Sequence, residues 1–105
     1  MPHTELRVGL IGAGRAGTVI ARALERAGHP CVAVHAVSDA SRERAARMLP
    51  SADVVDSLAV CEAADLIIVA VPDSAIEATV AGLVAAGAVT SIPTSFRHAF
   101  CRAVA

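Results

Sequence analysis

The chain alternates short apolar runs with longer segments in which apolar residues recur at helical spacing. The runs over residues 6–11 and 31–37 are too short for stable helices and rich in small and β-branched residues, which predicts two buried strands. Residues 66–71, Leu-Ile-Ile-Val-Ala-Val, are apolar at both parities, a pattern typical of a central parallel strand. A further short strand is predicted over residues 53–55.

Helical patterns separate and follow these runs. Residues 16–27 carry one apolar stripe that ends at Gly28, where a left-handed conformation is cheap. Further helices are predicted over residues 38–50 and 58–63, and over 74–87, which opens with the capping-box pattern S-x-x-E. The resulting order βαβαβαβα predicts the α/β class, with right-handed crossovers in a doubly wound parallel sheet.

Composition narrows the classes of protein that fit this pattern. The 105 residues suit one domain, and a chain that is 55% hydrophobic but 2% aromatic builds its core from Ala, Val, Leu and Ile. A net charge of -1 gives no basic surface for nucleic acid or an anionic membrane. Three dispersed cysteines indicate neither a disulfide framework nor a metal knuckle. We expect a cytoplasmic protein with no nucleic-acid, membrane or metal partner.

A glycine-rich turn links the first predicted strand to the first predicted helix. Its sequence is Gly12-Ala13-Gly14-Arg15-Ala16-Gly17. In the order strand, G-x-G-x-x-G, helix, this pattern is the fingerprint of dinucleotide binding. Gly12 permits the tight turn, Gly14 lets the backbone approach a pyrophosphate, and Gly17 lets helix and strand pack closely. The N–H groups of Arg15 and Ala16 then point at a phosphate, and the Arg15 side chain can add a charge-assisted contact. The alternative is that the glycines only make a tight turn.

The end of the second strand decides between the two nicotinamide cofactors. An acidic residue about 20 positions after the glycines accepts the ribose hydroxyls of NAD. Asp39 lies one or two places late for that role and equally fits a helix cap. Ser38 with Arg42 can instead receive the 2′-phosphate of NADP, which we favour slightly over NAD.

Three segments resemble a known superfamily. They are Val8-Gly9-Leu10-Ile11-Gly12-Ala13-Gly14-Arg15-Ala16-Gly17, Ala27-Gly28-His29-Pro30 and Val69-Ala70-Val71-Pro72-Asp73. The sequence resembles ketopantoate reductases and deazaflavin-dependent NADP oxidoreductases, and most closely a bacterial family with a Rossmann-like N-terminal domain and a helical C-terminal domain. The resemblance covers about residues 6–88. It implies an NAD(P)-dependent oxidoreductase in which Val71 and Pro72 line the cofactor near its ribose and nicotinamide end.

The resemblance stops near residue 90, and the composition changes there. We expect a partial Rossmann-like domain over residues 1–89 and a divergent tail over 90–105, without an obvious strand. A shifted reading frame, a short cofactor-binding module, or a partner-binding helix with Phe96 and Phe100 at i, i+4 would each explain the tail. Without a fifth strand, residues 66–71 would form an open sheet edge, from which we expect self-association.

The tail matches no later part of the family pattern, so no catalytic residue or substrate is assigned. The alternative to an oxidoreductase is a non-catalytic nucleotide-binding or regulatory module.

The remaining polar and sulfur-containing residues have simpler interpretations. We expect His35 to be packed or capped and the cysteines Cys31 and Cys61 to behave as small hydrophobic residues. The arginines of the second helix, Arg42, Arg44 and Arg47, are expected on a solvated face. Asp73 and Ser74 follow the strand at 66–71, where they either border the nicotinamide or cap a helix.

Overall fold

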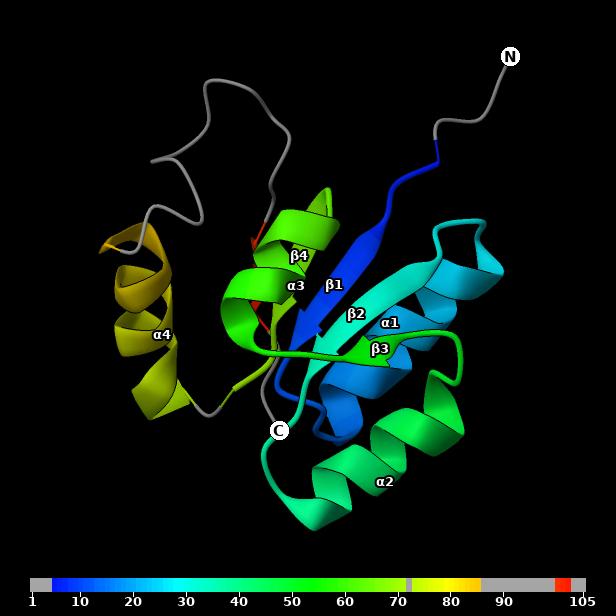
Figure 1. Cartoon of the computed structure of the whole chain (residues 1–105), viewed down its shortest axis with the longest axis horizontal. Helices are drawn as coiled ribbons and strands as arrows, with labels where there is room; N and C mark the ends of the chain where they lie inside the picture. The colour runs from blue at the N-terminus through cyan, green and yellow to red at the C-terminus, as the bar shows by residue number, and fades with distance from the viewer. Residues whose placement is uncertain (1–4, 72, 86–99, 103–105) are drawn as a thin grey trace.

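The computed structural model describes residues 5–71, 73–85 and 100–102 of the chain. The elements in chain order are β1 (Val8–Ile11), α1 (Arg15–Arg26), β2 (Cys31–His35), α2 (Asp39–Met48), β3 (Asp53–Val54), α3 (Ser57–Ala63), β4 (Leu66–Val69), α4 (Asp73–Ala85) and β5 (Phe100–Arg102). The strands form one five-stranded parallel sheet in the order β3-β2-β1-β4-β5 (Figure 1). The chain therefore runs outward from β1 to β3, crosses back to β4 beside β1, and continues outward to β5.

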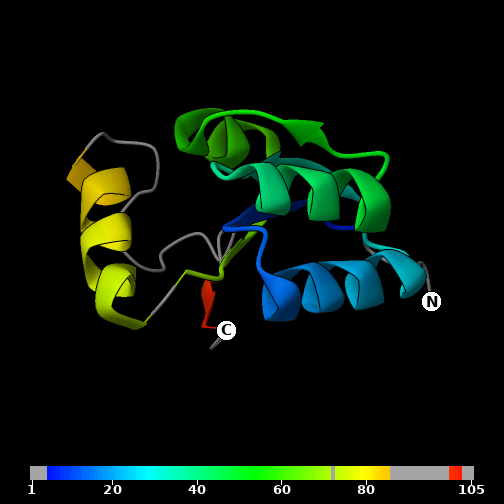
Figure 2. The ribbon, with the colours of Figure 1, turned by 90° about the horizontal axis from the view of Figure 1, so that it is seen from below.

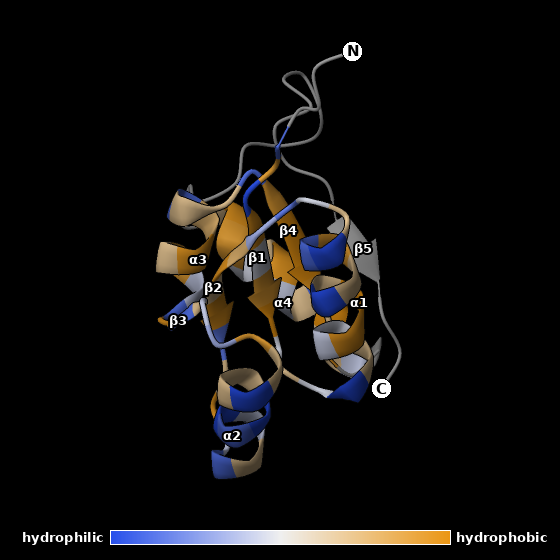
Figure 3. Ribbon diagram, turned by 90° about the vertical axis from the view of Figure 1, so that its right-hand side faces the viewer, coloured by the Kyte–Doolittle hydropathy of each residue, from blue (hydrophilic) through white to orange (hydrophobic). Residues whose placement is uncertain are grey.

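The two faces of the sheet carry separate cores. Successive strand residues point to opposite faces, so Leu10 packs with α1 and α2 while Ile11 packs with α3. Figures 2 and 3 show α1 and α3 on opposite sides of the apolar strands. Leu83 of α4 joins the core on the α3 side. The predicted doubly wound α/β fold is confirmed by this arrangement.

Small residues let helices approach the central strand closely on both faces. A Cβ at Gly9 of β1 would lie 2.6 Å from Val60 Cγ1 and 2.8 Å from Ala64 Cβ, both on the α3 side. On the other face, a Cβ at Gly17 of α1 would lie 2.6 Å from Ala70 Cβ. Since real Cβ atoms do not approach to such distances, both positions are restricted to glycine by packing.

The ends of the helices follow the sequence signals in two cases. At the end of α1, Gly28 has φ +97°, and the N–H groups of Gly28 and His29 donate to the carbonyls of Glu25 and Leu24. This pair of bonds is a Schellman motif, as the glycine predicted. At the start of α2, the Ser38 side chain accepts a hydrogen bond from the Ser41 N–H, as expected of a helix cap.

The structure corrects two expectations. Helix α4 begins at Asp73, so Ser74 lies in its first turn and not at the N-cap of a capping box. The tail is not without a strand, because Phe100–Arg102 forms β5 and pairs with Ile67–Val69 of β4. The expected open edge at β4 is therefore wrong, and helix in the tail is excluded for these three residues. Phe96 and the predicted helix end at Gly87 lie outside the described residues.

Candidate functional site

The glycine-rich turn lies at the carboxyl end of β1, where the chain's direction of winding reverses. β1 is flanked by β2 on one side and by β4 on the other, and the crossovers to these two neighbours cover opposite faces. In open parallel sheets, ligands bind at such a switch point, outside the carboxyl ends of the strands. The turn therefore occupies the position where a ligand is expected.

The first and third glycines of the turn are required by the fold itself. Gly12 has φ +94°, and a Cβ there would lie 2.5 Å from the Ala70 carbonyl oxygen. Gly17 would meet the Gly12 carbonyl oxygen at 3.0 Å besides Ala70. These contacts match the tight turn and the close helix–strand packing predicted for the two positions.

The middle glycine has different surroundings. Gly14 is the N-cap of α1 with φ -79°, a conformation open to most residues, and no atom lies within 4 Å of an added Cβ. Its carbonyl accepts from the Thr18 N–H at 3.1 Å and the Thr18 hydroxyl at 2.8 Å. Within the described ranges, no protein acceptor is found for the N–H groups of Gly14, Arg15 or Ala16. Free donors at a helix N-terminus beside open space are the features of an anion site.

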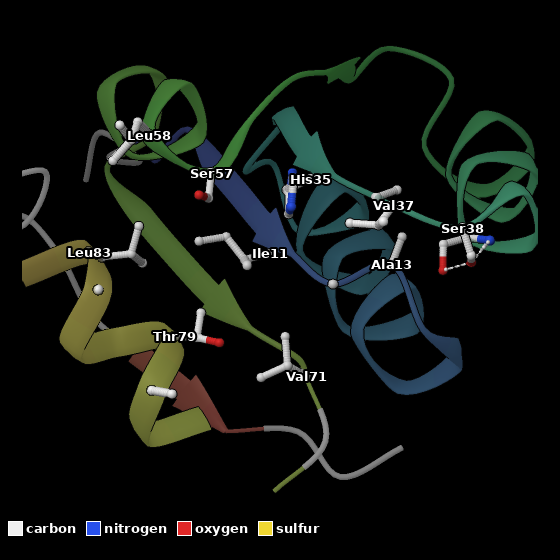
Figure 4. Close-up of a pocket in the computed structure, with 15 residues that line it drawn as sticks. Ile11, Ala13, His35, Val37, Ser38, Ser57, Leu58, Val71, Thr79 and Leu83 are labelled. Carbon is white, nitrogen blue, oxygen red and sulfur yellow. Dashed lines mark hydrogen bonds between the residues drawn. The ribbon is translucent and has the colours of Figure 1, made fainter. Parts of the chain in front are cut away.

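A pocket of about 570 Å³ extends from this turn along the carboxyl ends of β2 and β4. Its lining includes four of the residues predicted for the cofactor, which are Gly12, Ala13, Ser38 and Val71. Figure 4 shows these walls, with Thr79 of α4 facing the ends of β1 and β4. The structure thus brings together the turn, the end of the second strand and the end of the fourth.

Three further residues that line this pocket, Ser57, Leu58 and Thr79, were not predicted from the sequence. Ser57 and Leu58 at the start of α3 form one wall, and Thr79 of α4 forms another. These residues carry no motif, and only the crossing of the chain places their helices beside the ends of β1 and β2. Topology is therefore the signal that would have found them.

His35 lines the pocket and connects the ends of three neighbouring strands by hydrogen bonds. Its Nδ1 lies 3.1 Å from the Val55 carbonyl oxygen, so this nitrogen carries the proton and donates. Its own carbonyl accepts from the Gly12 N–H at 3.0 Å. Both bonds tie β2 to its neighbours, which agrees with the expected structural role.

The predicted 2′-phosphate residues sit at the start of α2. Ser38 and Ser41 both line the pocket, and their hydroxyl oxygens are 2.9 Å apart. Arg42 is exposed, and its Nε donates to the Ala36 carbonyl at 3.3 Å. Asp39 is the first residue of α2, next to the Ser38 cap, so the cap itself is the serine.

Arg44 does not lie on a purely solvated face. It is half-buried, and its Nη1 donates to the Ala13 carbonyl of the glycine turn at 3.0 Å. With Arg15 and Arg47 it also lines a second hollow of about 390 Å³ between α1 and α2. The Arg15 side chain therefore borders this second hollow and not the pocket.

Not every predicted site residue is placed by the structure. Pro72 and the side chain of Asp73 lie outside the described part of the chain, and Ser74 is exposed on α4. In the described ranges, no cluster of three or more potential metal ligands occurs, and no helix has the length and apolar character needed to cross a membrane.

The two described cysteines are poor nucleophiles. Burial, reinforced by the nearby Glu25 carboxylate, raises the pKa of the Cys31 thiol to about 11. Burial and then Glu62 also raise the pKa of the Cys61 thiol. Both thiols remain protonated at neutral pH, as expected for small buried residues.

Strand order, crossovers and glycine turn together define a doubly wound Rossmann-like α/β domain. The chain belongs to the Rossmann-like domain family, whose model matches residues 1–98. No protein with a curated description matches it. The finer resemblance to ketopantoate reductases stays a prediction, as does the domain boundary at residue 89.

Solved structures similar to this chain include three with the names of oxidoreductases. An inferred NADP oxidoreductase, BF3122 of Bacteroides fragilis, is 32% identical with a TM-score of 0.59 over 76% of this chain and 31% of its own. An imine reductase variant from Myxococcus stipitatus, in complex with NAD+, is 25% identical with a TM-score of 0.58 over 72% and 25%. The UDP-N-acetylglucosamine 3-dehydrogenase GnnA of Acidithiobacillus ferrooxidans, at 23% identity and a TM-score of 0.65 over 81% and 28%, shares the fold. The chain spans less than a third of the length of each.

Proposed function

We propose that this chain binds a nicotinamide dinucleotide, NADP in preference to NAD, as the cofactor-binding part of an oxidoreductase. The observation that carries the proposal is the open space at Gly14, beside N–H groups for which the described residues supply no acceptor. A pyrophosphate there would accept hydrogen bonds from the turn and gain from the positive end of the α1 dipole.

The pocket gives the two ends of the dinucleotide separate places. Its volume of about 570 Å³ extends from the turn past His35 to Ser38, which suits the adenosine half. The nicotinamide half would run toward Val71 and Pro72, at the end of β4. NADP is favoured because Ser38, Ser41 and Arg42 gather two hydroxyls and a guanidinium where a 2′-phosphate would lie.

The residues of this chain would bind and orient the cofactor. When bound, a nicotinamide dinucleotide supplies hydride transfer, and the protein supplies position and electrostatics. No catalytic residue is assigned, and the described residues do not identify a substrate. The neighbours' names support the oxidoreductase class and not a particular reaction.

Gly14→Val tests the pyrophosphate cradle. A valine would fill the space that the ligand needs, while φ -79° and the empty surroundings let the free chain keep its fold in spite of a weaker helix cap. We expect NADPH binding, followed by titration calorimetry, to weaken by at least about a hundredfold, with an unchanged circular dichroism spectrum. Ala46→Val, at an exposed position of α2, is the matched control and should bind like the parent. Undiminished affinity in Gly14→Val would rule out the cradle.

Arg42→Ala tests the preference for NADP. Loss of a charge-assisted contact to the 2′-phosphate should weaken NADPH binding by about tenfold and leave NADH binding nearly unchanged. Arg47→Ala removes the same charge from the same helix, and it should affect the two cofactors equally. An equal loss of affinity for NADPH and NADH in Arg42→Ala would mean that Arg42 does not contact the 2′-phosphate.

A further inference from the structure

The contact between Arg44 and the glycine turn joins residues that are 31 positions apart in the sequence. Arg44 lies in α2, and its Nη1 donates to the Ala13 carbonyl at 3.0 Å. Its side chain is half-buried, and no carboxylate pairs with it in the described part of the chain. The guanidinium of Arg44 is therefore bound to a backbone oxygen of the turn.

The Ala13 carbonyl and the Gly14 N–H belong to the same peptide unit. None of the described peptide bonds is cis, and in a trans peptide the C=O and N–H vectors point in opposite directions. A carbonyl drawn toward α2 therefore turns the Gly14 N–H away from α2. The direction of a donor at the proposed pyrophosphate site is fixed by whatever holds this carbonyl.

Within the described residues, the bond from Arg44 is the one hydrogen bond that this peptide unit makes. Rotating it by about half a turn would carry φ of Gly14 from -79° to positive values, which glycine tolerates and other residues do not. No atom lies within 4 Å of the Cβ position of Gly14, so this side of the residue is open. In the rotated state a carbonyl would face the bound anion in place of an N–H.

We propose that Arg44 is a positioning residue that locks the Ala13–Gly14 peptide unit with its N–H directed at the cofactor pyrophosphate. This inference rests on the proposed function for its effect on affinity, but its effect on the turn is a property of the free protein. The positive guanidinium also offsets part of the partial negative charge of the Ala13 carbonyl.

The test compares Arg44→Met with Arg47→Met in the full chain. Methionine keeps most of the stem volume and cannot donate, and Arg47 lines the same hollow without a hydrogen bond in the described residues. We expect Arg44→Met to weaken NADPH binding by about tenfold or more, and Arg47→Met by no more than about threefold. Arg44→Lys, which can still donate, should regain part of the loss.

A second readout separates positioning from charge. In the ligand-free, ¹⁵N-labelled protein, the Gly14 amide resonance should shift or broaden in Arg44→Met and stay in place in Arg47→Met. Equal losses of affinity in the two variants, with an unmoved Gly14 resonance, would overturn the proposal. If the parent binds neither NADPH nor NADH, the proposed function fails, and the Gly14 resonance still decides the role of Arg44. Arg44→Gln provides the same readout if Arg44→Met does not fold.

Discussion

The three glycines of one six-residue motif have different surroundings. Gly12 needs a left-handed backbone and has a carbonyl oxygen 2.5 Å from its Cβ position, whereas Gly17 is confined by Ala70 and Leu10. Gly14 meets neither restriction. At this scale the sequence predicted well, because the order strand, motif and helix implies each role. The structure adds that no contact within the free chain restricts Gly14 to glycine, whereas the proposed pyrophosphate contact would.

This difference predicts stability effects of different size at two positions of the motif. Gly17→Ala forces a Cβ against backbone and core atoms, so we expect a loss of about 1–3 kcal/mol in the free energy of unfolding. Gly14→Ala should change it by less than about 0.5 kcal/mol, since the weaker helix cap offsets the lower entropy of the unfolded chain. Urea unfolding of both variants measures this. A Gly14→Ala variant as unstable as Gly17→Ala would mean that the open space at Gly14 is filled.

Arg44 shows where residue-level prediction from sequence ends. Its spacing with Arg42 and Arg47 predicted a solvated face. That spacing contains no signal for the hydrogen bond to the Ala13 carbonyl. The bond depends on α2 packing beside α1 on the same face of the sheet. Such pairing follows from tertiary structure, which local periodicity does not contain.

At the scale of elements, the strands and helices with a pattern of their own were predictable, including the short β3 and α3, whereas β5 was not. The strand at β4 was clear because its residues are apolar at both parities, and the end of α1 was clear from Gly28. β5 has three residues and no alternation of its own. Its strand geometry comes from pairing with Ile67–Val69, more than 30 positions earlier in the chain. A strand that is stabilised mainly by pairing with its neighbour is therefore hard to predict from its own residues.

The pairing of β5 predicts what happens when it is broken. Phe100→Pro together with Cys101→Pro removes two backbone donors from the strand and should expose the edge of β4, whose four residues are all apolar. We expect the double variant to self-associate more strongly than the parent in light scattering across a concentration series. The same substitutions on α4, Val84→Pro with Ala85→Pro, are the control for proline in general. A double variant at β5 that scatters like the parent would show that β5 does not protect the edge.

For the whole molecule, the buried thiols predict a loss of stability at alkaline pH. Burial raises the pKa of Cys31 from 9.0 to about 11, so above pH 9 the unfolded chain releases this proton before the folded chain does. Stability is therefore full below about pH 9 and declines toward pH 11, by up to about 3 kcal/mol from this residue. Cys61 acts in the same direction.

The composition of this chain makes it simple to assign a loss of stability at alkaline pH to the cysteines. All nine basic residues are arginine and there is no tyrosine, so cysteines and the chain's amino terminus are the groups that titrate between pH 8 and 11. Unfolding by urea at pH 8, 9, 10 and 11 should show the decline in the parent, and a shallower one in Cys31→Ala. The slope with pH carries the test, because the alanine also costs packing energy that does not vary with pH. Parallel slopes in the two proteins would mean that Cys31 ionises as freely in the folded protein as in the unfolded one, and that the core beneath α1 is open to water.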